Sequence, residues 1–112
     1  MIPVSKNEVV SFTDEESGIV FKSMPIVGEN EKEFYRIAEE ISKVSSNFDV
    51  EALSKLLDPF IDTVLIGWDA KDGIAKFPED KKPSAMFRTL DKVNMFKAIS
   101  KENKLTVTEQ KN

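Results

Sequence analysis

Two short apolar runs near the start of the chain have the composition of β-strands. Residues 8–13 (EVVSFT) and 18–26 (GIVFKSMPI) are rich in β-branched and aromatic side chains, which pack well on a pleated surface. The polar stretch between them ends in Gly18, as connections between paired strands often do. The pattern predicts an antiparallel β-hairpin over residues 8–26. Pro25 lacks a backbone N–H and is expected at its end or at a sheet edge.

The next segment changes to helical periodicity. Its apolar residues recur three and four positions apart, at Phe34, Ile37, Ala38, Ile41 and Val44. That spacing places them on one helix face. Asn30 followed three residues later by Glu33 has the form of a capping box. We therefore predict a helix over about residues 31–45.

An Asp-Pro pair interrupts the following apolar stretch. Asp49 is expected to cap a helix that begins at about residue 50. Pro59 removes a backbone N–H and disfavours helical geometry at the preceding residue, but it is well tolerated at the first position of a helix. We therefore predict two helices, about 50–57 and 59–68, that meet at a bend.

The last predicted helix, about 84–101, has an unusual apolar pattern. One row recurs every three residues, at Leu90, Val93, Phe96 and Ile99. Because successive residues are about 100° apart, this row drifts by ~60° at each step. Phe87 and Met95 lie outside the row. Either the helix is sandwiched between apolar surfaces, or part of its apolar surface meets another chain.

Together these elements predict a single α+β domain that is mostly helical. The chain has 112 residues, which is typical of one domain with one core. We expect the globular domain to span residues 1–103, with the N-terminal β-hairpin packed beside a bundle of about four helices. A flexible C-terminal tail is expected over residues 104–112. Residues 74–77 are compatible with a short strand against the hairpin.

The chain contains few of the side chains on which most enzymes depend. It has no cysteine and no histidine, so thiolate chemistry, the commonest general base and the commonest transition-metal ligand are excluded. Its four glycines do not form a phosphate-binding loop. Asp58, Asp62, Asp69 and Asp72 do not have the spacing of a calcium loop. We therefore expect no enzyme, no cofactor and no metal site.

Charge is distributed unevenly along the chain. Residues 1–56 carry 11 acidic and 6 basic side chains, whereas residues 81–112 carry 3 acidic and 8 basic ones. This asymmetry favours either head-to-tail self-association or a charged partner, although a solvated helix with a lysine-rich tail would have the same composition. The pI near 4.9 and lysines spread around the last helix argue against nucleic-acid binding.

Five residues are candidates for a partner-binding surface. Phe87, Met95 and Ile99 are chosen because the apolar residues of the last helix do not share one stripe. Trp68 is the only tryptophan and stands beside a turn, where it serves either as a core anchor or as an interface residue. Asp69 follows it directly.

The order of residues after position 59 resembles a known family. The run Phe60–Asp69 (FIDTVLIGWD) is followed by Asp72-Gly73, by Phe77-Pro78 and by an amphipathic helix. This order is similar to that of the tail assembly chaperones of long-tailed bacteriophages, over roughly residues 50–102. In that family a helix ends in a Val-x-x-Trp-Asp/Glu-like block, and Trp68 and Asp69 are carried over from it.

The resemblance implies a non-enzymatic role in the cytoplasm of an infected bacterium. Such chaperones bind tape measure and tail tube proteins, keep them soluble and leave before the virion is finished. The resemblance also implies self-association, and often a longer product made by ribosomal frameshifting. Two other functions stay open: an acidic phage or mobile-element inhibitor of a host enzyme, and a structural head–tail adaptor. No nucleic-acid or membrane partner is expected.

Overall fold

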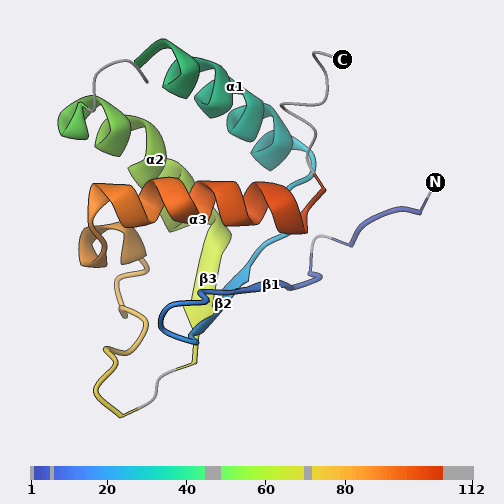
Figure 1. Cartoon of the computed structure of the whole chain (residues 1–112). Helices are drawn as coiled ribbons and strands as arrows, with labels where there is room; N and C mark the ends of the chain where they lie inside the picture. The colour runs from blue at the N-terminus through green and yellow to red at the C-terminus, as the bar shows by residue number, and fades with distance from the viewer. Residues whose placement is uncertain (1, 6, 45–48, 70–71, 105–112) are drawn as a thin grey trace.

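The computed structural model describes residues 2–5, 7–44, 49–69 and 72–104, in which three α-helices gather on one side of a three-stranded sheet (Figure 1). The elements in chain order are β1 (Val10–Thr13), β2 (Val20–Ser23), α1 (Glu29–Val44), α2 (Val50–Val64), β3 (Leu65–Trp68), the 3₁₀ turn η1 (Pro83–Met86) and α3 (Thr89–Glu102). The predicted mostly helical α+β class is confirmed. The described part has three α-helices instead of about four.

The N-terminal hairpin forms as predicted. β1 and β2 pair antiparallel, with Phe12 opposite Phe21. In the turn, the backbone N–H and the hydroxyl of Ser17 both donate to the Asp14 carboxylate, at 3.1 and 2.6 Å. Gly18 then adopts a φ of +74°, a conformation that side chains with a Cβ disfavour. Local turn chemistry therefore fixes the hairpin register.

The segment predicted as two helices folds as one helix and a strand. α2 continues through Pro59, and β3 follows it at Leu65 and pairs antiparallel with β2. Pro59 itself is exposed, whereas Leu57 and Phe60 on either side are buried. Core packing therefore outweighs the hydrogen bond that the proline removes. The predicted helix over 59–68 is wrong for its last four residues, because the aliphatic run Leu65-Ile66 suits a strand and β2 offers it a partner.

Of the two predicted N-caps, the one of α2 is confirmed and the one of α1 is not. The prediction of Asp49 as an N-cap is confirmed, because its carboxylate accepts the backbone N–H of Ala52 at 3.1 Å. α1, however, begins at Glu29, so Asn30 lies inside its first turn and does not form a capping box. Glu33 pairs instead with Arg36 on the helix surface. The predicted end of α1 at residue 45 lies outside the described residues.

The predicted last helix is divided into η1 and α3. Phe87 and Arg88, which join them, have extended backbones. A contact between α2 and η1 lies just before this break. The Asp62 carboxylate of α2 accepts both the backbone N–H and the hydroxyl of Ser84, each at 2.9 Å. A helix start that depends on a residue 22 positions away leaves no local sequence signal. Of the predicted tail, only Lys104 lies within the described residues.

The drifting apolar row of α3 passes from solvent into the core. Leu90 is 57% exposed and Val93 is half-buried, whereas Phe96 and Ile99 are 7% and 1% exposed. Residues three apart on an α-helix are displaced by about 60° around its axis. The row therefore crosses from the outer face to the inner face, and α3 is not sandwiched between two apolar surfaces within the described fold.

Aromatic contacts join the three helices at the centre of the core. Phe34 of α1 stacks on Phe96 of α3, with ring centroids 4.5 Å apart. Phe60 of α2 meets Phe96 edge to face at 5.6 Å. Such pairs contribute about 0.5–1.5 kcal/mol each beyond the burial of their area. All three rings are at most 7% exposed.

A row of polar contacts, which we term the polar seam, fixes η1 and α3 on α2. Ser54, Asp58 and Asp62 lie one turn apart on α2, so they share one face. Ser54 contacts Thr89 at 3.3 Å, and Asp62 holds Ser84. Between them the Lys92 ammonium, whose side chain is 7% exposed, donates to the Asp58 carboxylate at 2.6 Å. Asp58 thus lies inside α2 and pairs with Lys92, and no second helix begins beside it.

The two partners of this ion pair are unequally buried, which predicts unequal effects of replacing them. Asp58→Asn should destabilise the fold by about 1–3 kcal/mol, because it leaves the buried Lys92 ammonium without its counter-charge. Lys92→Met keeps the buried stem and leaves a carboxylate that is 38% exposed, so it should cost less than about 1 kcal/mol. Urea denaturation measures both, and the reverse order would contradict this account.

Candidate functional site

An open apolar hollow at one end of the sheet is the candidate site. It holds about 110 Å³. Its lining comes from β2 and the residue before it, β3, the connection after β3, and the end of η1: Ile19, Phe21, Trp68, Ile74, Ala75, Met86 and Phe87. We call it the aromatic hollow, because three of these residues are aromatic.

Strand register builds the wall of the hollow. Phe12, Phe21 and Trp68 lie opposite one another on β1, β2 and β3, so their side chains lie on one face of the sheet. The Phe12 and Phe21 rings stack at 5.3 Å, and Phe21 meets Trp68 edge to face at 5.8 Å. Phe12 is buried and Trp68 is half-buried. The aromatic row therefore runs from the core to the rim of the hollow.

Trp68 also holds the segments beyond the sheet. Its indole meets Phe77 at 5.1 Å and Phe87 at 5.5 Å, both edge to face. Its Nε1–H donates to the backbone oxygen of Ala75 at 2.8 Å. The polar group of this large side chain is thus satisfied by the connection after β3, and its apolar faces remain for packing. The proposed short strand at 74–77 is not formed, and this hydrogen bond anchors the segment instead.

The size of the hollow limits what it can bind. Sites for drug-sized molecules and cofactors usually enclose 300–1,000 Å³, whereas this hollow holds about 110 Å³. A cavity of about 150 Å³ is filled by one benzene-sized group. The aromatic hollow therefore has room for a single apolar side chain.

Of the five residues predicted for a partner surface, the structure brings two together. Trp68 and Phe87 both line the hollow. Asp69 lies next to Trp68 along the chain and forms an exposed ion pair with Lys22 at 3.3 Å. Met95 and Ile99, in contrast, are 6% and 1% exposed. They are not exposed as a binding surface in this fold, because they lie on the face of α3 that turns toward the core.

The sequence patterns did not point to the other five lining residues: Ile19, Phe21, Ile74, Ala75 and Met86. Phe21 stands two residues from Ile19 in the second strand, so alternation indicates that both lie on one face. The partner strand of that face was not recognisable, because residues 65–68 were assigned to a helix. Met86 is 41% exposed, and its position depends on the division between η1 and α3.

The lining of the aromatic hollow contains no charged side chain. The Arg36 guanidinium hydrogen-bonds to Glu33 on the surface of α1 and lowers the pKa of that carboxyl below its usual value. No cluster of three or more metal-ligating side chains occurs among the residues that the structure describes. Within the same residues, no helix combines the length and the apolar character needed to cross a membrane.

Comparisons with models of known protein families, with curated proteins and with solved structures found no match for this chain.

The hydrogen bond of Trp68 predicts a local effect of a conservative change. Trp68→Phe keeps an aromatic ring in the hollow but removes the donor to Ala75, so it should destabilise the fold by about 1 kcal/mol. Amide hydrogen exchange of residues 74–77 should accelerate relative to that of α1. Unchanged exchange in this segment would show that the bond does not hold it.

Proposed function

We propose that this protein is a non-catalytic assembly chaperone that binds apolar segments of partner proteins through the aromatic hollow. The partners are the tape measure and tail tube proteins of a long-tailed bacteriophage, and the binding takes place in the cytoplasm of the infected bacterium. The observation that carries the proposal is an open hollow, lined by Trp68, Phe87 and Met86, with room for one apolar side chain.

The chemistry of the lining fits a reversible binder. Burial of one leucine- or methionine-sized side chain contributes about 1.5–3 kcal/mol, which corresponds to roughly a 10- to 150-fold gain in affinity. Such a contribution lets a partner bind and later leave. Met86 is unbranched and 41% exposed, so it can adjust to side chains of different shape. Both properties suit a chaperone better than a permanent structural contact.

The family resemblance gives the proposal its biological setting. The block that resembles tail assembly chaperones, residues 60–69, includes the end of α2 at Val64 and all of β3. Its tryptophan, Trp68, lies in the wall of the hollow. The residues that carry the resemblance and those that carry the proposed binding thus overlap at this position.

A charge placed at the rim should abolish binding without disturbing the fold. Met86→Glu puts a carboxylate beside an apolar ligand, so binding of an uncharged leucine-containing synthetic peptide should weaken at least about tenfold. Val50→Glu is the matched control, because Val50 is 54% exposed and does not line the hollow. Trp68 is the only tryptophan, so its fluorescence reports occupancy directly. Equal weakening by both variants would exclude the hollow as the binding site.

The chaperone assignment has an independent test. Tail tube and tape measure genes should lie beside the gene for this chain, and co-expression should raise the soluble fraction of their products. The Met86→Glu variant should lose this effect. Small early genes as neighbours would favour the inhibitor, and presence of the protein in purified virions, by mass spectrometry, would favour the head–tail adaptor.

A further inference from the structure

The outer face of α3 carries a narrow row of exposed residues, which we term the outer stripe: Leu90, Asn94, Lys97 and Lys101. Their spacings of four, three and four residues keep them within about 60° around the helix axis. Met95 and Ile99 are buried on the opposite face. The two lysines are one turn apart, which places their backbone positions about 6 Å from each other along the helix.

The charges of the outer stripe differ from those of the other helices. On α1, Lys32, Arg36 and Lys43 each pair with a glutamate three residues before them. On α2, Lys55 pairs with Glu51. Within the part of the chain that the structure describes, Lys97 and Lys101 form no ion pair. Basic charge on the surfaces of α1 and α2 is thus paired with a nearby glutamate, whereas the two lysines of the outer stripe are not paired.

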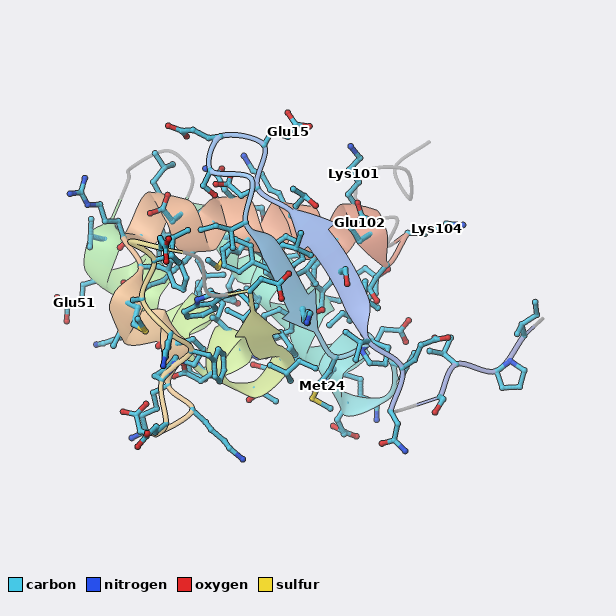
Figure 2. The ribbon with its side chains drawn as sticks, turned by 90° about the horizontal axis from the view of Figure 1, so that it is seen from below. Glu15, Met24, Glu51, Lys101, Glu102 and Lys104 are labelled. Atoms are coloured by element: carbon cyan, nitrogen blue, oxygen red, sulfur yellow. The ribbon has the colours of Figure 1, made fainter. Side chains whose placement is uncertain are left out.

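Neighbouring residues reinforce this imbalance. Arg88, directly before α3, is exposed and also forms no ion pair among the described residues. The two acidic residues of α3, Asp91 and Glu102, lie about 100–120° from Leu90 around the helix, on the flank of the stripe. Figure 2 shows Lys101 and Glu102 at the C-terminal end of α3, with Lys104 just beyond it. The helix dipole accounts for a lysine in the last turn, such as Lys101, but not for Lys97 one turn earlier.

We propose that the outer stripe binds an acidic helical segment of a partner protein. Carboxylates at i and i+4 of such a segment would match the one-turn spacing of Lys97 and Lys101, and an apolar residue about two turns away would cover Leu90, which is 57% exposed. This inference rests on the proposed function, because it names the chemistry of the partner that the aromatic hollow would anchor. The stripe selects the partner by charge, whereas the hollow holds one apolar side chain.

Charge complementarity favours a polypeptide over nucleic acid. The chain carries a net charge of −4, so a long polyanion would meet repulsion outside the stripe. A nucleic-acid site usually shows a strongly basic domain with many phosphate contacts. Two lysines one turn apart, next to an exposed leucine, instead match a short amphipathic acidic segment.

The test measures binding of synthetic helical peptides by fluorescence anisotropy. The probe carries glutamates at i and i+4 and a leucine two turns away, and a matched peptide carries lysines in place of the glutamates. The Lys97→Glu/Lys101→Glu variant should bind the glutamate peptide about tenfold more weakly, because two rim charges are reversed. The Lys32→Glu/Lys43→Glu variant has the same net charge and should change binding less than about twofold.

Several outcomes would overturn the inference. These are equal weakening by both variants, equal binding of the lysine peptide, or tighter binding of a single-stranded oligonucleotide of matched charge. A dimer that only the α3 variant disrupts, by sedimentation, would assign the stripe to a second copy of the chain instead. The proposed function is tested separately, because Met86→Glu addresses an uncharged peptide. If only the binding of the uncharged peptide is lost, the effect of charge on binding of the glutamate peptide can still be measured.

Discussion

The buried ion pair between Lys92 and Asp58 constrains how α3 can lie on α2. An ammonium that is 7% exposed needs its counter-charge, because a buried charge without a partner is strongly unfavourable. α3 must therefore keep the rotation about its axis at which Lys92 reaches Asp58. This one rotation turns Met95 and Ile99 into the core and Lys97 and Lys101 outward. The inner and outer faces of α3 are thus two results of the same contact.

The same constraint explains why a helix with a weak apolar pattern folds well. A row that repeats every three residues cannot define one buried face, since it drifts around the helix. Hydrophobic burial alone would leave several rotations of α3 with similar energy. The polar seam selects one of them, because Thr89 and Lys92 of α3 reach Ser54 and Asp58 of α2 in only one rotation of α3. We therefore expect these polar contacts to contribute more to the specificity of the packing than to its stability.

Elements that depend on interactions between residues close in the sequence were predicted, and elements that depend on residues far apart in the sequence were not. The hairpin, α1 and the Asp49 cap follow from local periodicity and capping, and they were predicted, apart from the exact start of α1. β3 was missed because Val64-Leu65-Ile66 suits either a helix or a strand, and the choice is made by β2, about 40 residues away. The division at Phe87 was missed for a similar reason, since Asp62 fixes Ser84. For the candidate site, Trp68 and Phe87 were found. The position of Phe21 in the lining required the strand pairing, and that of Met86 required the division between η1 and α3.

The junction between α2 and β3 has a mechanical consequence. Leu65 both caps α2, through its N–H to the Ile61 oxygen, and begins β3, so no linker residue separates helix from strand. A hinge needs residues whose backbone angles can change freely, and at this junction Val64 ends the helix while Leu65 is already paired with Ser23 of β2. Trp68, at the far end of β3, is therefore connected to α2 by a single strand with no flexible linker. We expect a displacement of the indole to be passed along β3 to the helix that carries Asp58.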